Sequence, residues 1–229
     1  MMRRSSICLA WCALVVFSAG PFGDVHAGGE FGQELHRMHK GKAPNRADGK
    51  GKPNVVVIFT DDLGWTDLGC YGSKFYETPH IDRLANQGTL FRNAYAACNV
   101  CSPTRAALMT GKYPQRVGFT DWLNPDRRSG PNSAATALPA SEVTIGEAFQ
   151  QGGYRTGYIG KWHLGPQDHA MPKQQGFDWQ MASSRHGYPS SYFFPYRKNT
   201  SGDVPDLENG KPGDYLTDVL TTRAIGFME

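Results

Sequence analysis

The sequence predicts an α/β fold, with a mostly parallel sheet flanked by helices, from two strand candidates and four helical patterns. Residues 55–59 form a continuous apolar, mostly β-branched run, which is typical of a strand buried on both faces of a parallel sheet. Residues 154–160 are the second candidate for an inner strand. Helical patterns stand at 78–88, 103–112, 144–151 and 214–229. Strands that alternate with helices indicate a layered α/β architecture.

The helix predicted at 78–88 has signals at both ends. Thr78 is a favourable N-cap, Pro79 suits the first helical position, and Gly88 ends the pattern. Its core-facing stripe is expected to consist of Ile81, Leu84 and Ala85. Residues 90–96, which follow this helix, are a candidate for a short strand.

The later elements are predicted from a capping box, a loop-rich composition and an apolar stripe. Thr144 and Glu147 fit a capping box for a helix that ends at Gln151. Residues 165–213 are rich in Gly, Pro, Ser and aromatic residues and are expected to form mostly long loops. The chain stops on an apolar helical face without a cap, so we expect the α/β core to be incomplete here, as in a fragment or a truncated gene product. That face consists of Leu216, Val219, Leu220 and Phe227.

The chain is expected to have three parts: a signal peptide at 1–27, a flexible linker at 28–53 and one globular portion at 54–229. A pair of arginines, a short apolar segment and a small-residue cleavage site are typical of a secretory signal, although a buried N-terminal helix is an alternative. No later segment predicts a membrane span, so we expect an exported protein, periplasmic or extracellular. The net charge of +3 over 229 residues is too balanced to indicate nucleic-acid binding.

Three of the five cysteines lie outside the predicted signal peptide, namely Cys70, Cys98 and Cys101. An odd number of cysteines in an exported protein indicates one thiol with a special chemistry. Cys98 and Cys101 also form a C-x-x-C pair, which is compatible with a redox pair or half of a zinc site. No second C-x-x-C follows, so the sequence disfavours both of these interpretations.

Asp61 and Asp62 come directly after the first predicted strand. That position is the carboxyl edge of the sheet, where ligands bind in such folds. Two adjacent carboxylates repel each other unless a cation neutralises them, and their hard oxygens suit Ca²⁺ or Mg²⁺. The alternative is that the pair only forms a turn or caps a helix.

Cys101 is expected at or just before a helix N-terminus, because Pro103 suits the first helical turn. The free amides and the dipole of a helix start favour an anion. Arg105 adds a positive fork that can pair with a sulfate oxygen or a carboxylate. The residues thus predict a binding site for a tetrahedral oxyanion, with a buried core cysteine as the alternative.

Lys161 and His163 follow the second predicted strand within a glycine-flanked segment, 160–165. Residues two apart in an extended segment point the same way. The lysine can hold an oxyanion and the histidine can transfer a proton near neutral pH. The alternative is a surface loop with an exposed lysine.

Together these segments resemble the type I sulfatase family, within the alkaline-phosphatase-like superfamily. The family pattern, C-x-P-[S/T]-R followed after four residues by T-G, is matched throughout by residues 101–111. Weaker matches follow the family's order and spacing, at 54–64, 78–84, 160–165 and 175–178. The resemblance implies an alkaline-phosphatase-like core, of which 54–229 is the N-terminal portion of the catalytic domain.

The resemblance also implies a chemistry for residue 101. Cys101 would be oxidised to Cα-formylglycine by a formylglycine-generating or other sulfatase-maturing enzyme. One hydroxyl of the aldehyde hydrate would attack the sulfate ester, and the other would expel sulfate and restore the aldehyde. Asp61, Asp62 and Cys101 match positions of a Ca²⁺ site, where the ion polarises the sulfate oxygens.

Further roles follow from the same resemblance. Arg105 matches a residue that steadies the formylglycine hydroxyls, and Lys161 and His163 match positions that hold the nucleophile and sulfate and move protons. The implied catalytic set is therefore Cys101, Arg105, Lys161 and His163, with Lys161 and His186 as substrate-binding residues. The family's Asp-Asn calcium ligands, and a further His and Lys, are expected beyond this chain. We therefore expect the chain alone to bind Ca²⁺ weakly and to hydrolyse sulfate esters poorly or not at all.

Three functions stay open at this point. The first is hydrolysis of sulfate esters, on a sulfated carbohydrate rather than a small aryl sulfate, because export suggests polymer breakdown. The others are a phosphodiesterase or phosphonate hydrolase of the same superfamily, and a truncated, non-catalytic binder of sulfated glycans. Loop aromatics are expected either to stack on sugars or to serve packing, namely Trp122, Trp179, Tyr188 and Tyr192.

Overall fold

A four-stranded sheet with the strand order β2-β1-β3-β4 forms the centre of the molecule. The computed structural model describes residues 13–18, 51–123, 135–166, 170–197 and 203–229. The strands are β1 (Ala13–Ser18), β2 (Val55–Phe59), β3 (Arg155–Gly160) and β4 (Trp179–Met181). β2, β3 and β4 run in the same direction, and β1 runs against them. The predicted α/β fold with a mostly parallel sheet is confirmed.

β1 lies within the segment predicted to be a signal peptide. Its backbone pairs with β2 on one side and β3 on the other, so that Ala13 lies opposite both Phe59 and Gly160. The rest of 1–27 and most of the predicted linker lie outside the described residues. The signal peptide therefore stays a prediction, and removing it would take the strand between β2 and β3 out of the sheet.

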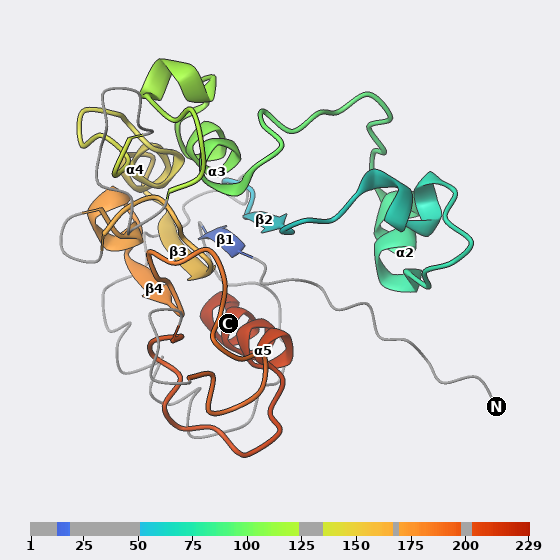
Figure 1. Cartoon of the computed structure of the whole chain (residues 1–229). Coiled ribbons are helices and arrows are strands. Elements are labelled where there is room, and N and C mark those ends of the chain that lie inside the picture. Colours follow the sequence, from blue (N-terminus) through green and yellow to red (C-terminus); the bar gives the residue numbers. More distant parts are fainter. Residues whose placement is uncertain (1–12, 19–50, 124–134, 167–169, 198–202) are drawn as a thin grey trace.

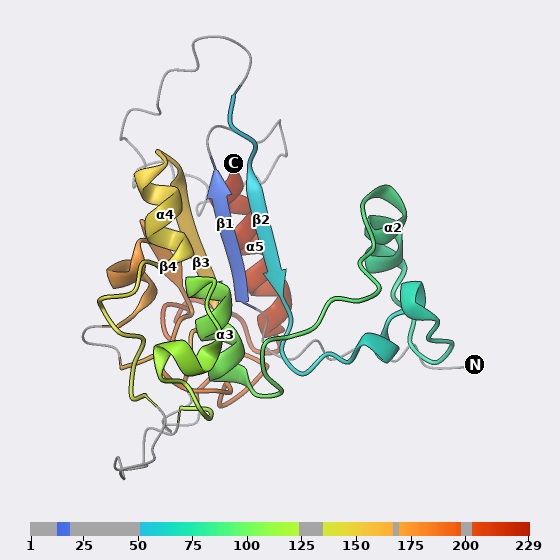
Figure 2. The ribbon, with the colours of Figure 1, turned by 90° about the horizontal axis from the view of Figure 1, so that it is seen from above.

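Helices cover both faces of the sheet, as the two views in Figures 1 and 2 show. α3 (Cys101–Thr110) and α4 (Ile145–Gln151) lie on one face, and α5 (Leu216–Met228) lies on the other. Side chains of a strand alternate between faces, so β3 contributes to two cores. Tyr158 packs into the core under α3 and α4, and Ile159 packs into the core under α5. We call this layered unit the sheet body.

The helix signals in the sequence agree with the structure. The capping box of α4 is confirmed, because Thr144 Oγ1 accepts from the Glu147 amide at 3.2 Å and the Glu147 carboxylate accepts from the Thr144 amide at 2.8 Å. α2 (Pro79–Gln87) ends at Gly88 as predicted. Short 3₁₀ helices span Trp65–Asp67, Gly69–Tyr71, Pro114–Val117 and Pro172–Gln175.

Residues 64–98, here the α2 segment, depart from the prediction. The strand expected at 90–96 is wrong, since these residues form turns and irregular backbone. No residue of α2 is buried, and Leu84 of its predicted core-facing stripe is 62% exposed. The physical reason is visible in Figures 1 and 2, where the α2 segment stands apart from the sheet body. An amphipathic pattern predicts a helix but not the surface that covers it.

Candidate active site

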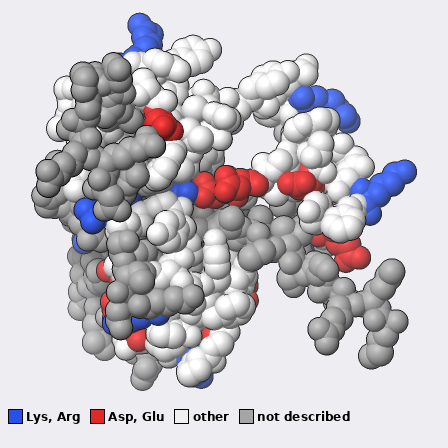
Figure 3. Space-filling view, viewed as in Figure 1, with Lys and Arg blue, Asp and Glu red and all other residues white. Residues whose placement is uncertain are grey.

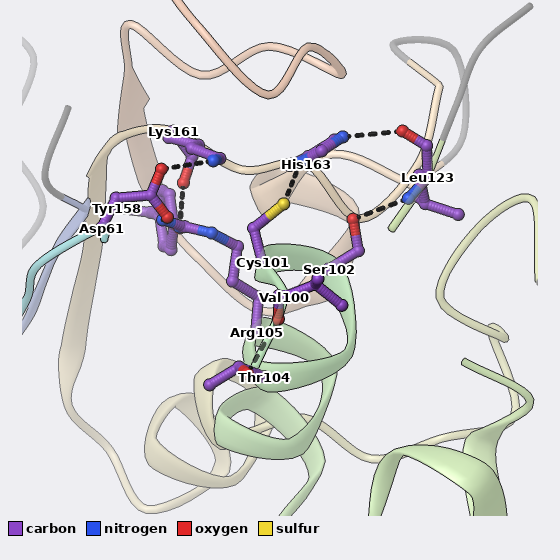
Figure 4. A network of polar contacts seen from close by, with 10 residues as sticks. All are labelled: Asp61, Val100, Cys101, Ser102, Thr104, Arg105, Leu123, Tyr158, Lys161 and His163. Carbon is purple, nitrogen blue, oxygen red and sulfur yellow. Dashed lines mark hydrogen bonds and ion pairs between the residues drawn. The ribbon is translucent and has the colours of Figure 1, made fainter. Parts of the chain in front are cut away.

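The candidate residues meet at one end of the sheet because β2 and β3 run in the same direction. Asp61 follows the end of β2, Lys161 follows the end of β3, and Cys101 is the first residue of α3. Figure 4 shows the Cys101 side chain leaving the helix start toward the segment that carries Lys161 and His163. The carboxyl ends of strands and a helix N-terminus thus converge where α/β folds bind ligands.

Two buried cations share the carboxylate of Asp61. Lys161 Nζ lies 2.5 Å from one carboxylate oxygen, and an Arg105 terminal nitrogen lies 3.3 Å from the other. Both cationic side chains are 2% exposed, against 12% for Asp61. Within this cluster two positive charges face one negative charge. A buried excess of positive charge favours a bound anion.

Tyr158 and a main-chain carbonyl hold the guanidinium in place. Arg105 donates to the Lys161 carbonyl at 2.6 Å and to the Tyr158 hydroxyl at 3.4 Å. The Tyr158 hydroxyl donates to the same carbonyl at 2.6 Å. Burial raises the pKa of Tyr158 to about 12, so the hydroxyl stays protonated. Arg105 Nε is buried and has no hydrogen-bond partner among the described residues, which leaves one donor of the fork uncommitted.

His163 presents an unprotonated nitrogen to Cys101. Its Nε2 lies 2.8 Å from the Leu123 carbonyl, and its Nδ1 lies 3.3 Å from Cys101 Sγ. A carbonyl only accepts, so Nε2 carries the proton and donates. Burial, with smaller effects of Lys161 and Arg105, lowers the pKa of His163 to about 4, so the ring is neutral at pH 7. Nδ1 is therefore a base aimed at the side chain of residue 101.

The start of α3 leaves its amides without a side-chain cap. The N-cap residue Val100 makes no side-chain hydrogen bond to the helix. The Thr104 hydroxyl donates to the carbonyls of Cys98 and Val100, at 2.8 and 2.9 Å, and so fixes the approach to the helix. Ser102 Oγ accepts from the Leu123 amide at 2.9 Å. The first amides of α3 consequently remain available to an anion next to residue 101.

The chain is similar to proteins of one known family. A family model described as Sulfatase matches residues 53–229. The chain belongs to the sulfatase family. The predicted type I sulfatase membership is confirmed, and this is a family of sulfuric-ester hydrolases.

Named relatives agree with this assignment. The sulfatase chain is 40% identical over 195 residues to N-acetylgalactosamine-6-sulfatase of Homo sapiens, covering 77% of this chain and 36% of the relative. It is 46% identical over 128 residues to arylsulfatase A of Homo sapiens, covering 55% of this chain and 24% of the relative. The chain thus spans about a third of the length of the first of these relatives.

A solved structure supports the fold of the sulfatase chain. It is the crystal structure of Ps i-CgsB in complex with k-i-k-neocarrahexaose, with a TM-score of 0.58 and 36% identity. The match covers 73% of this chain and 39% of that one. Among the described residues, no helix has the length and hydropathy needed to cross a membrane.

The predicted metal ligands of the sulfatase chain do not all lie together. Both oxygens of Asp61 already face cations, whereas Asp62 is exposed and has a left-handed backbone with φ of 54°. In the described part of the chain, no group of three or more His, Cys, Asp or Glu side chains is placed to hold a metal ion. Two adjacent carboxylates with free lone pairs still fit part of a hard-cation site.

His186 lies in a loop that contacts the site. The His163 amide donates to the Ser184 carbonyl at 3.1 Å, and Gly187 packs against the His163 ring. His186 itself is 8% exposed, and its Nε2 accepts from Arg185 Nε at 3.3 Å. The structure therefore brings the loop of His186 to the site, and the His186 ring accepts a hydrogen bond from Arg185 of the same loop.

Three contributors to this candidate site are not indicated by the sequence patterns. The sequence predicts a strand at Tyr158, and the alternation of side chains along that strand is compatible with its position on the face of α3. The carbonyl of Leu123 sets the tautomer of His163, and the Ser102 hydroxyl anchors the same segment. A hydrogen bond from a side chain to a main-chain carbonyl 40 positions away leaves no signal in a single sequence.

Proposed function

We propose that the protein to which this chain belongs hydrolyses sulfate esters, with residue 101 as its nucleophile after conversion of Cys101 to Cα-formylglycine. One observation carries the proposal: the side chain of Cys101 faces a neutral His163 Nδ1 at 3.3 Å, beside the buried cations Arg105 and Lys161. A base at the nucleophile and fixed positive charge near it are what transfer of an anionic sulfate group requires.

The modified residue supplies a hydroxyl that can attack sulfur and later release sulfate, which a thiol cannot do reversibly. His163 Nδ1 holds or accepts the proton of the group at position 101, and the Leu123 carbonyl keeps the ring in the required tautomer. Lys161, Arg105 and the first amides of α3 offer positive charge to the sulfate oxygens.

Two further groups belong to this proposal. Asp61 and Asp62 would supply carboxylates to a Ca²⁺ ion, which would add positive charge at the sulfate. A formylglycine-generating or other sulfatase-maturing enzyme would convert Cys101. That conversion breaks the C–S bond, releases the sulfur as sulfide, adds an oxygen from water to the side-chain carbon and removes two electrons, which that enzyme passes to its own oxidant. Export, to the periplasm or outside the cell, is proposed from the signal-like N-terminus.

We propose a sulfated carbohydrate as the substrate. The related structure named above is in complex with k-i-k-neocarrahexaose, and a relative bears the name N-acetylgalactosamine-6-sulfatase. His186 is proposed as a substrate-binding residue because its loop contacts His163.

The test uses the complete reading frame expressed with a maturation enzyme. Mass spectrometry of the peptide that contains Cys101 should find an aldehyde in place of the thiol. The Cys101→Ala variant should lose roughly 10³-fold or more in turnover of sulfated sugars and of an aryl sulfate. An unmodified thiol in an active protein, or full activity of Cys101→Ala, would sink the proposal.

The same protein should be assayed with matched phosphate diesters and phosphonates. Faster turnover of these than of sulfate esters would favour the phosphodiesterase or phosphonate hydrolase interpretation. Binding of sulfated glycans without turnover of any ester would favour a non-catalytic glycan binder.

A further inference from the structure

An exposed tryptophan is tied to the active-site histidine through its neighbour. Leu123 uses both of its main-chain groups at the site: its carbonyl accepts from His163 Nε2 at 2.8 Å, and its amide donates to Ser102 Oγ at 2.9 Å. Trp122 immediately precedes this anchored residue and is 40% exposed. The main chain next to Trp122 is therefore held beside the start of α3 by the two hydrogen bonds of Leu123.

An exposed tyrosine is tied to the same histidine from another side. A Cβ atom added to Gly187 would lie 2.7 Å from His163 Cε1, so the Gly187 backbone is in contact with the imidazole ring. The Ser184 carbonyl accepts from the His163 amide at 3.1 Å, which fixes the same loop a second time. Tyr188 follows Gly187 and is 64% exposed.

For the other two loop aromatics, the structure favours packing over stacking on sugars. Trp179 is 6% exposed and stacks on Phe227 of α5, with ring centroids 5.1 Å apart and 12° between the planes. Tyr192 is partly buried against the core under α5, and its carbonyl accepts from the Leu216 amide at 2.8 Å. Two of these aromatics thus have a structural role, whereas Trp122 and Tyr188 are exposed and each adjoins a residue that contacts His163.

We propose that Trp122 and Tyr188 form a carbohydrate subsite that flanks the nucleophile and binds the apolar C–H face of the sugar ring carrying the sulfate. This inference rests on the proposed sulfatase function. An aromatic ring has a negative π face, which attracts the weakly positive C–H groups of a pyranose and removes apolar surface from water. The sulfate group of the same sugar then lies at residue 101, where Arg105 and Lys161 provide positive charge.

The subsite has a consequence for specificity. It contacts the sugar rather than the group being transferred, so it contributes to binding in the ground state and in the transition state alike. Loss of such uniform binding raises KM and leaves kcat nearly unchanged. Loss of His163 or Lys161, by contrast, lowers kcat.

The test measures steady-state kinetics on a sulfated oligosaccharide with the mature protein. Trp122→Ala and Tyr188→Ala should each raise KM roughly 10-fold with little change in kcat, and Trp122→Phe and Tyr188→Phe should restore most of the loss. The matched control is Tyr113→Ala, which removes a 69% exposed tyrosine beyond the other end of α3 and should leave both constants unchanged. Unchanged KM in both alanine variants, in a protein that hydrolyses the substrate, overturns the subsite alone.

A second measurement is independent of turnover. In the Cys101→Ala background, calorimetric titration with the same oligosaccharide should show binding that Trp122→Ala weakens roughly 10-fold. Binding that is equal with and without Trp122 and Tyr188 overturns the subsite. If the parent protein lacks activity but this binding and its loss are observed, the sulfatase proposal fails while the subsite stands.

Discussion

α3 and α2 carry similar local signals but differ completely in burial. Each has a proline in its first turn and ends at a glycine, Gly111 or Gly88. α2 has no buried residue, whereas α3 buries five, namely Ser102, Pro103, Arg105, Ala106 and Met109. Local sequence therefore determines where a helix begins and ends, and the sheet beneath it determines what the helix buries.

The chain passes from the sheet body to the α2 segment at Asp61 and Asp62. Asp61 belongs to the buried cation cluster, while Asp62, one residue later, is exposed. On the face drawn in Figure 3, acidic side chains gather along the connection between the two regions. The boundary between the packed and the open region thus runs through the candidate metal-binding pair.

The largest expected difference between the two regions concerns buried charge. Arg105→Met should lower the free energy of unfolding by about 3–5 kcal/mol, because it breaks a buried ion-pair network. Arg83→Met, at an exposed position of α2, should change it by no more than about 0.5 kcal/mol. Urea denaturation of both variants measures the difference, and equal effects would contradict the distinction between the regions.

Apolar burial gives the next difference. Met109→Ala, at a position 3% exposed in α3, should cost about 3 kcal/mol through a cavity in the core. Leu84→Ala, at a position 62% exposed in α2, should cost less than about 0.5 kcal/mol. A cost for Leu84→Ala close to that of Met109→Ala would mean that the stripe of α2 is covered in solution.

The stability of the sheet body should also depend on pH through His163. Its pKa falls from 6.5 to about 4 on folding, so as pH falls the unfolded chain takes up the proton first. Stability should therefore be lost between about pH 6.5 and 4, by up to about 3 kcal/mol. His163→Gln should reduce the dependence of the free energy of unfolding on pH in this range. His80→Gln, at an exposed position of α2, should leave that dependence unchanged. An unchanged slope in His163→Gln would refute the assigned neutral form.

The smallest expected difference lies in local hydrogen bonds. Thr144→Ala removes the capping box of α4. Thr78→Ala removes a hydroxyl that accepts a hydrogen bond from the Gly69 amide and donates one to the Asp82 carboxylate. Each should cost about 1 kcal/mol in thermal or urea unfolding, because each bond is local to its region. A much smaller cost for Thr78→Ala would show that the hydrogen bonds of Thr78 do not stabilise the α2 segment in solution.

The sequence was sufficient for features that depend on short-range patterns. The strand at 55–59, the capping box at Thr144 and the helix starting near Pro103 all occur where expected, and the motif at 101–111 predicted the sulfatase family correctly. The expected burial of 55–59 on both faces is wrong, because β2 is an edge strand of the described sheet and Val56 and Ile58 are 40% and 65% exposed. The tautomer of His163 could not be predicted, because it depends on a carbonyl 40 residues away. The exposure of Leu84 and the burial of Trp179 could not be predicted either, since periodicity does not say which surface covers a side chain.

The position of β1 links processing of the N-terminus to completion of the sheet. Cleavage after residue 27 would leave β2 and β3 facing each other across a gap of about 10 Å, twice the spacing of paired strands. Both strands would then expose a row of unpaired amides and carbonyls, which readily pair with another chain. The timing of leader removal would therefore help to decide which strand completes the sheet, and how long the new chain is exposed to aggregation.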